Sequence, residues 1–195
     1  MRGGSLKSYT AFSSIERHKE GALFDVVEIR RIQSTEDCNL PNEAFSLWGR
    51  MVPSLSDGKW EYTVQPFAER EEMCFPDCAY DPADGGCYLG AYDGGKCIGV
   101  AVLRRGWFRY LYLEDLKVKR ECRRKGAGAL LIQACMEEAR QAGLLGVYTV
   151  AQDNNLSACL FYLKNGFEIG GFDNRAYRGT SQEHKADIYF YRDLS

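Results

Sequence analysis

The sequence contains no long apolar run, no excess of positive charge and no repeated segment. None of its apolar runs approaches the roughly 20 residues that span a bilayer, and its first 12 residues lack the apolar segment of a signal peptide. The net charge of -2, from 25 Lys and Arg against 27 Asp and Glu, gives no positive field to attract nucleic acid. These absences predict a cytoplasmic globular protein that binds neither a membrane nor nucleic acid.

Histidine is also scarce, which limits the metal sites that the chain can form. Only His18 and His184 occur, and they are remote in sequence from the cysteines at 74, 78, 87 and 97. Those cysteines do not form the paired C-x2-C spacing of a structural zinc site. We therefore predict no metal, and reduced thiols for all eight cysteines, because no export signal is present.

The length of 195 residues is enough for one domain. Residues 1–21 are polar and without clear periodicity, and we expect them to be disordered. Residues 22–195 are predicted to form a single domain, and its recognisable motifs lie in 87–195.

The first part of this domain gives weak signals. Residues 23–29 (LFDVVEI) predict a strand because they are rich in β-branched and aromatic side chains. Asn42–Met51 predicts a helix that Pro53 ends, and the recurrence of Pro, Asp and Gly over 53–85 predicts short helices and loops.

The second half gives much clearer signals. Two apolar runs, Cys87–Tyr92 and Lys96–Arg104, are separated by Asp93-Gly94-Gly95, which predicts a hairpin. The remaining predicted elements are strands at Tyr110–Val118, Gly146–Gln152, Phe167–Phe172 and Asp187–Tyr191, and helices at Ala127–Ala142 and Leu156–Lys164. This order predicts the α/β (α+β) class: a mixed, mostly antiparallel sheet, flanked by helices, with a central parallel crossover through 126–146.

A glycine-rich basic segment lies between a predicted strand and a predicted helix. Its residues are Arg123, Arg124, Lys125, Gly126, Ala127, Gly128 and Ala129. The free N–H groups of a helix N-terminus bind anions, and glycine lets the backbone approach a phosphate closely. A helix start with a solvated basic face is the alternative, because a lone Gly-x-Gly is a weak motif.

The motifs around this segment resemble the GNAT superfamily of acetyl-CoA-dependent N-acetyltransferases. An R-x-x-G-x-G segment follows a strand that ends Leu116-Lys117-Val118, and Asn155 is followed seven residues later by Tyr162, then by Gly166-Phe167. More narrowly, Trp107 with the YLEDL segment at 112–116, the QDNN segment at 152–155 and the KADIYFY segment at 185–191 resemble the streptothricin acetyltransferase branch. Those enzymes acetylate the β-lysine amine of an antibiotic.

The resemblance implies that acetyl-CoA is the co-substrate, and it implies how the chain holds it. Backbone groups of Leu116 and Val118, with Lys117 between them, would bind the acetyl-pantetheine arm. The segment from Arg124 to Ala129, with Arg123 beside it, would bind the pyrophosphate. Asn155 would bond the pantetheine, and Ala158 would pack against it.

Acyl transfer to an amine requires that the ammonium lose a proton and that the leaving thiolate gain one. Glu114 and Asp115 are the candidates for the proton acceptor, and strand alternation predicts that they point to opposite sides. We favour Glu114, which shares the parity of Tyr112 and Leu116, although a bulge expected from the family fold would break that argument. A salt bridge of Glu114 with Arg109 or Lys117 is the alternative.

The proton donor implied by the resemblance is Tyr162, whose hydroxyl would reach the CoA sulfur. A role as a core aromatic is the alternative, and Phe161 beside it has that role. An N–H group of the strand near Lys117-Val118 would stabilise the negative charge on the carbonyl oxygen.

Acidic and aromatic side chains near the pocket would bind a cationic acceptor through ion pairs and cation–π contacts. The candidates are Trp107, Tyr112, Asp115 and Asp187. The predicted function is acetylation of a primary amine on a small cationic molecule, such as the β-lysine amine of a streptothricin. The alternatives are a GNAT that acts on a protein N-terminus, a lysine or a polyamine, and a non-catalytic CoA-binding module; a homodimer is left open.

Overall fold

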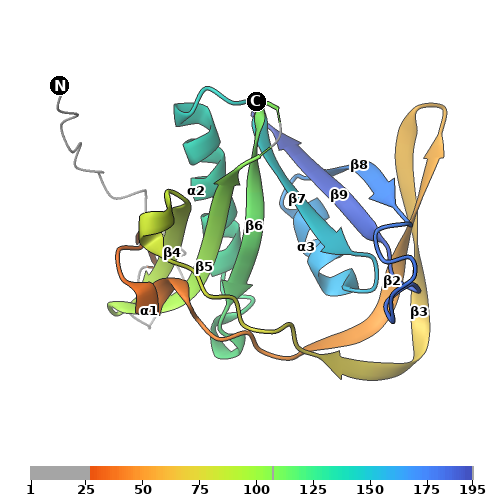
Figure 1. Cartoon of the computed structure of the whole chain (residues 1–195), viewed down its shortest axis with the longest axis horizontal. Coiled ribbons are helices and arrows are strands. Elements are labelled where there is room, and N and C mark those ends of the chain that lie inside the picture. The colour runs from red at the N-terminus through yellow and green to blue at the C-terminus, as the bar shows by residue number, and fades with distance from the viewer. Residues whose placement is uncertain (1–26, 107, 195) are drawn as a thin grey trace, which may run out of the picture.

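The computed structural model describes residues 27–106 and 108–194 (Figure 1). The predicted disordered segment 1–21 and most of the first predicted strand lie outside these ranges. The strands are β1 (Glu28–Arg31), β2 (Phe45–Ser56), β3 (Lys59–Met73), β4 (Cys87–Asp93), β5 (Lys96–Arg105), β6 (Tyr110–Val118), β7 (Gly146–Gln152), β8 (Glu168–Asp173) and β9 (Asp187–Asp193). The helices are α1 (Thr35–Cys38), α2 (Ala127–Gln141) and α3 (Leu156–Lys164), with two 3-10 turns at η1 (Pro82–Asp84) and η2 (Arg120–Cys122).

Seven strands form one sheet in the order β1-β4-β5-β6-β7-β9-β8. β6 and β7 pair in parallel, and α2 connects them, whereas every other neighbouring pair in this sheet is antiparallel. The predicted mixed sheet with a central parallel crossover is therefore confirmed. The predicted hairpin of β4 and β5 is also confirmed, and its turn uses the positive φ angles of Gly94 and Gly95.

The two long helices cover one face of the sheet, and α1 lies on the other (Figure 1). The buried stripe of α2, which includes Leu131 and Cys135, packs with Leu103, Leu113 and Val147 from three central strands. Burial raises the pKa of the Cys135 thiol, as expected for a packing residue rather than a nucleophile. On the opposite face, a smaller apolar cluster joins α1 to β4 and β5.

The first part of the domain differs from the sequence-based expectation. The predicted helix over Asn42–Met51 is wrong, because β2 and β3 form a long two-stranded hairpin that projects beside the main sheet (Figure 1). The predicted short helices and loops over 53–85 are wrong up to Met73, where β3 ends, and are found only after it, as a loop with the turn η1. The two-residue turn of the hairpin is Asp57-Gly58, with φ angles of 50° and 76°, which is the geometry of a tight hairpin turn. Gly49 also favours this arrangement, because a Cβ there would lie 2.8 Å from the Gln65 carbonyl oxygen.

The parallel pair β6 and β7 opens partway along its length. The two strands pair only from Tyr110–Tyr112 with Gly146–Tyr148, and beyond that point they diverge (Figure 1). The antiparallel partner β5 follows β6 across the divergence, but the register shifts between Val102 and Leu103, so that Glu114 is an extra residue in β6. The sheet therefore has an opening next to a β-bulge.

No helix in the described ranges is both long enough and apolar enough to cross a bilayer.

Candidate active site

The N-terminus of α2 has the features of an anion site. Arg124 and Gly126 both have positive φ angles, of 62° and 98°, which turns the chain sharply before the helix. No side chain caps the helix, and its first turn contains no acidic residue. The first helical bond runs from the Leu130 N–H to the Gly126 carbonyl, so the N–H groups of Ala127, Gly128 and Ala129 precede it. N–H groups without a partner in the helix are the groups that bind anions at helix N-termini.

The basic residues of this segment divide into two kinds. Arg123 is occupied by protein contacts: its Nε donates to the Val118 carbonyl at 2.8 Å, and its Nη2 lies 3.1 Å from Glu43. Arg124 and Lys125 are exposed. Arg123 therefore fixes the loop, and the other two supply positive charge beside the helix N-terminus.

The open edge of β6 presents backbone groups to the opening. The Lys119 N–H donates to the Ile98 carbonyl of β5 at 2.8 Å, and a Cβ on Gly99 of β5 would lie 3.0 Å from the Lys117 carbonyl oxygen. The backbone N–H and C=O groups of Lys117 and Lys119 therefore face β5. Backbone groups alternate along a strand, and those of Leu116 and Val118 therefore face the opening. Of the two residues near the predicted oxyanion position, Lys117 directs its N–H toward β5 and its side chain toward Asp115, 3.0 Å away, so the Val118 N–H is the one that faces the opening.

At the start of α3, Asn155 acts as the helix N-cap. Its Oδ1 accepts from the Ala158 N–H at 3.3 Å. The Nδ2 of the same amide is the group that would contact the pantetheine arm. A Cβ on Gly128 would lie 3.2 Å from the Phe161 ring, so the absence of a side chain there lets α2 and α3 lie close together.

The bulge changes the orientation of the two candidate proton acceptors. Because Glu114 is the extra residue, Leu113 and Leu116 both pack toward the helices, whereas Glu114 and Asp115 both point to the other face. The prediction that strand alternation separates the two carboxylates is therefore wrong. The ion pairs also differ from those expected: Glu114 contacts Arg104 at 2.8 Å, rather than Arg109 or Lys117.

Asp115 lies deeper than Glu114, and its surroundings differ. Its Oδ2 contacts Lys117 Nζ at 3.0 Å and accepts from the Tyr80 hydroxyl at 3.4 Å. Its charge also acts on Tyr162. The bulge therefore brings two carboxylates to one rim of the opening, with the proton-donor candidate nearby.

Tyr162 lies on the helix-covered side of the opening. Its ring contacts Phe161, Phe167 and Phe190, with centroids between 5.4 and 5.7 Å away. Burial raises the pKa of its hydroxyl well above the ordinary value, and Thr149 partly offsets this shift. The hydroxyl thus remains protonated at neutral pH, as a proton donor requires. Tyr162 is therefore a core aromatic whose hydroxyl lies beside Thr149 of β7.

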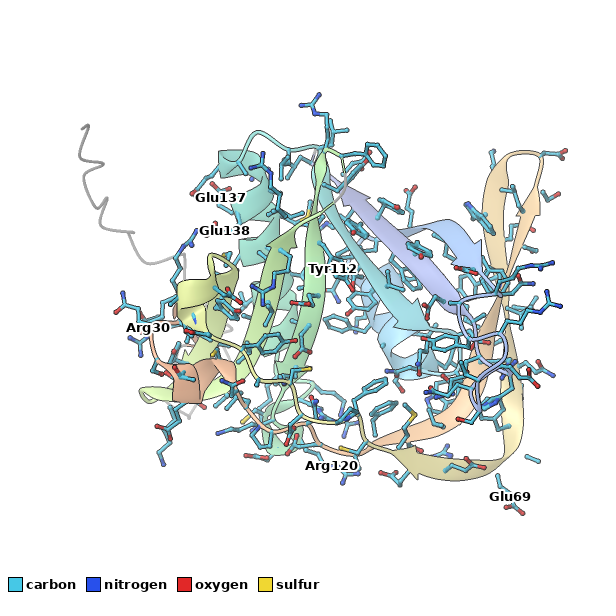
Figure 2. The ribbon with its side chains drawn as sticks, in the orientation of Figure 1. Arg30, Glu69, Tyr112, Arg120, Glu137 and Glu138 are labelled. Carbon is cyan, nitrogen blue, oxygen red and sulfur yellow. The ribbon has the colours of Figure 1, made fainter. Side chains whose placement is uncertain are left out.

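The face opposite α2 and α3 is acidic and rich in tyrosine; we call it the acceptor face. It comprises Tyr112, Glu114, Asp115, Tyr148, Gln152, Asp187 and Tyr189 around the opening. Tyr112, labelled in Figure 2 beside the opening, stacks on Tyr148 at 4.9 Å. Glu114 and Asp187 both act electrostatically on Tyr112, so carboxylates from both sides of the opening lie near it.

Asp187 is a half-buried carboxylate at the start of β9. Burial raises the pKa of the Asp187 carboxyl. Among the residues that the structure describes, the Tyr177 hydroxyl is the one donor to this carboxylate, at 2.8 Å. The Tyr177 hydroxyl in turn accepts from Gln152 at 3.0 Å. None of the ion pairs in the described ranges includes Asp187. A bound ammonium would supply the positive charge that this carboxylate lacks.

The sequence did not reveal several neighbours of the site. Trp107, the remaining predicted substrate contact, lies outside the described residues. Tyr80, Asp84 and Arg104 surround the carboxylates of Glu114 and Asp115. Tyr80 and Asp84 lie in the connection between β3 and β4, and no sequence motif marks that connection. Strand alternation alone predicts that Arg104 lies on the same face of its strand as Val102.

A cavity of about 320 Å³ lies between the β2–β3 hairpin and the connection from β8 to β9. Arg50, Asp153 and Lys185 are among its lining residues, and no predicted site residue is. Lys185 also reaches Gln152 Oε1 at 3.5 Å, so the cavity adjoins the acceptor face. Within the described residues, no group of His, Cys, Asp and Glu is arranged to hold a metal ion.

This combination of a bulged strand, an opened parallel pair and an uncapped helix N-terminus defines an acyl-CoA-dependent transferase fold. A model of the Acetyltransferase (GNAT) family matches residues 52–167, and the chain belongs to that family. It is an acetyltransferase, and acetyl-CoA is its co-substrate. The family assignment made from the motifs is therefore confirmed.

Among relatives, the chain is similar to enzymes named for one antibiotic class. Streptothricin acetyltransferase A of Bacillus subtilis (strain 168) is 33% identical over 160 residues, which cover 80% of this chain and 92% of that protein. A streptothricin acetyltransferase of Escherichia coli is 32% identical over 138 residues, covering 70% and 78% of the two chains.

Two solved structures resemble the whole domain. A protein of Bacillus anthracis (strain Ames), assigned as a streptothricin acetyltransferase and crystallised with acetyl coenzyme A, superposes with a TM-score of 0.78 at 29% identity. The match covers 86% of this chain and 99% of that chain. Nourseothricin acetyltransferase superposes with a TM-score of 0.72 over 87% of this chain and 99% of that chain, and its 22% identity supports the fold alone.

Proposed function

We propose that this acetyltransferase acetylates a primary amine of a small cationic molecule, and that this molecule is a streptothricin-type antibiotic. The observation that carries the proposal is the acceptor face, where Glu114, Asp115 and Asp187 lie among stacked tyrosines. Carboxylates pair with ammonium groups, and tyrosine rings bind cations over their faces. The names of the relatives give the choice of antibiotic class.

Acetyl-CoA would lie along the open edge of β6. The N-terminus of α2 would hold the pyrophosphate, backbone groups of Leu116 and Val118 would hold the pantetheine arm, and Asn155 would bond it from α3. This arrangement directs the thioester to the opening, where it supplies the acetyl group. The N–H groups of Leu116 and Val118 are then the donors available to the carbonyl oxygen.

The chain's own groups would move two protons. Glu114 accepts a proton from the substrate ammonium, which gives the neutral amine that attacks. Tyr162 donates its hydroxyl proton to the departing sulfur, and no acyl-enzyme is needed because both substrates bind together. Asp115 and Asp187 retain their charges and orient the cationic acceptor.

The test is a comparison of acceptors at equal concentration. CoA release is measured with a streptothricin, a polyamine, a lysine derivative and a peptide with a free N-terminus. We expect kcat/KM for the streptothricin to exceed that for each of the others by at least about 100-fold, the scale of one or two lost contacts. Equal or higher kcat/KM with the polyamine or the peptide would reassign the acceptor, and CoA binding without release would indicate a non-catalytic module.

A further inference from the structure

Arg104 on β5 joins Glu114 of the acceptor face to two residues outside that face, Asp84 and Tyr88. Its Nε donates to Glu114 Oε2 at 2.8 Å, its Nη1 lies 2.7 Å from both oxygens of Asp84, and its Nη2 donates to the Tyr88 hydroxyl at 2.8 Å. All three nitrogens of the guanidinium are therefore engaged. A planar guanidinium can make these contacts at once, and a lysine ammonium cannot.

The other end of this network is anchored independently. Asp84 also accepts from the Gly86 N–H and from the Tyr88 hydroxyl, each at 2.8 Å. The Arg104 hydrogen bond is the largest cause that lowers the Asp84 pKa, to about 2. Gly86 leaves room for the guanidinium, because a Cβ there would lie 2.1 Å from Arg104 Nη1.

We propose that Arg104 is a positioning residue for acetyl transfer, which fixes the Glu114 carboxylate at the rim of the opening while Asp84 shares its positive charge. The proposal rests on the proposed function, in which Glu114 takes the substrate proton. The Glu114 side chain needs a contact that fixes its position, because Glu114 is the extra residue of the bulge and has no directly opposed residue on β5.

The charge balance of the network gives Asp84 a specific part. An arginine paired with Glu114 alone would neutralise it, whereas an arginine shared by two carboxylates leaves one net negative charge at the rim. That remaining charge attracts the ammonium of the acceptor. The charge of Glu114 also acts on Tyr80 and Tyr112. The other titratable groups around the network are Tyr88, which contacts Arg104, and the Asp115–Lys117 pair.

The test measures kcat/KM for the amine as a function of pH, with the melting temperature recorded for each variant. Arg104→Gln is expected to lower kcat/KM roughly 10- to 100-fold, and Arg104→Lys is expected to restore only part of it. Gly86→Ala is expected to match the loss without removing a charge, because the new methyl group displaces the guanidinium. Arg105→Gln, at the exposed neighbouring position, makes the same charge change and is expected to match the parent protein.

The pH profile separates a positioning role from a merely structural one. Arg104→Gln removes a cation beside the proton acceptor and should move the acid limb to higher pH, whereas Asp84→Asn should move it to lower pH. Each shift is expected to be about half a unit or more. In a Glu114→Gln background, Arg104→Gln should cost almost nothing further, because its effect acts through Glu114.

Two results would overturn the inference. One is that Arg104→Gln and Gly86→Ala keep the parent kcat/KM while Glu114→Gln loses it. The other is that Arg104→Gln costs the same factor with and without Glu114. A Glu114→Gln variant with parent activity would instead refute the proton-acceptor role in the proposed function, which is a different failure.

Discussion

Replacing Gly128 with aspartate should abolish the binding of acetyl-CoA. At a hundredfold excess over Kd, a ligand that binds only the folded state stabilises it by about 2.7 kcal/mol, which corresponds to roughly 5–10 °C for a domain of this size. A carboxylate at about 4 Å from a phosphate charge repels it by about 4 kcal/mol near a protein surface, or roughly a thousandfold in Kd. At the same acetyl-CoA concentration, a thermal-shift assay of Gly128→Asp should therefore show no measurable response.

Gly128→Ala is the matched control for this experiment. Its methyl group meets the Phe161 ring at 3.2 Å, as the aspartate Cβ would, but it brings no charge. We expect it to keep most of the acetyl-CoA response. An aspartate variant that responds like the parent protein would refute the assignment of the pyrophosphate to the N-terminus of α2, and equal losses in both variants would mean that helix packing causes the effect.

Four further substitutions test the chemistry of the site. Tyr162→Phe should lower turnover roughly 100-fold with acetyl-CoA affinity unchanged, and parent turnover under conditions where chemistry limits the rate would return Tyr162 to a purely structural role. Glu114→Gln should lower turnover, with partial recovery at high pH where the amine deprotonates in solution; Asp115→Asn should mainly raise KM for the amine, and the reverse pattern would exchange their roles. Burial raises the pKa of Asp187, so the folded state binds that proton more tightly than the unfolded chain does, and the ionised carboxylate costs stability at neutral pH. Asp187→Asn should therefore raise the melting temperature and also raise KM for the amine; a lower melting temperature would contradict the stability argument.

The sequence predicted the second half of the fold well because its signals are local. The Asp93-Gly94-Gly95 turn, the amphipathic pattern of α2 and the glycine after each helix all agree with the tertiary structure. The β2–β3 hairpin was missed for an identifiable reason. Its Asp57-Gly58 turn is a strong hairpin signal, but the Pro, Asp and Gly residues around it were interpreted as loops. Gly49 and Pro53 lie within β2, where neither residue type is expected.

The candidate site was only partly predictable, because its geometry depends on one extra residue. A period-two pattern cannot reveal where a strand bulges, and the bulge at Glu114 reverses which face Asp115 occupies. The candidate anion site at the start of α2 could be proposed from the sequence, because glycines and a helix start mark it. No sequence motif identifies Arg104 and Asp84, because their contact joins β5 to a turn that lies 20 residues earlier in the chain.

The most direct test of the account follows an isotopically labelled acetyl group from acetyl-CoA. Purified protein is mixed with labelled acetyl-CoA and a streptothricin, and both the small molecule and the intact protein are analysed by mass spectrometry. The account predicts that the label appears on one primary amine of the acceptor, with an equal amount of free CoA and no label on the protein at any time. Label on the protein before the acceptor is added, or no labelled product with any amine offered, would contradict direct transfer to an amine on the acceptor face.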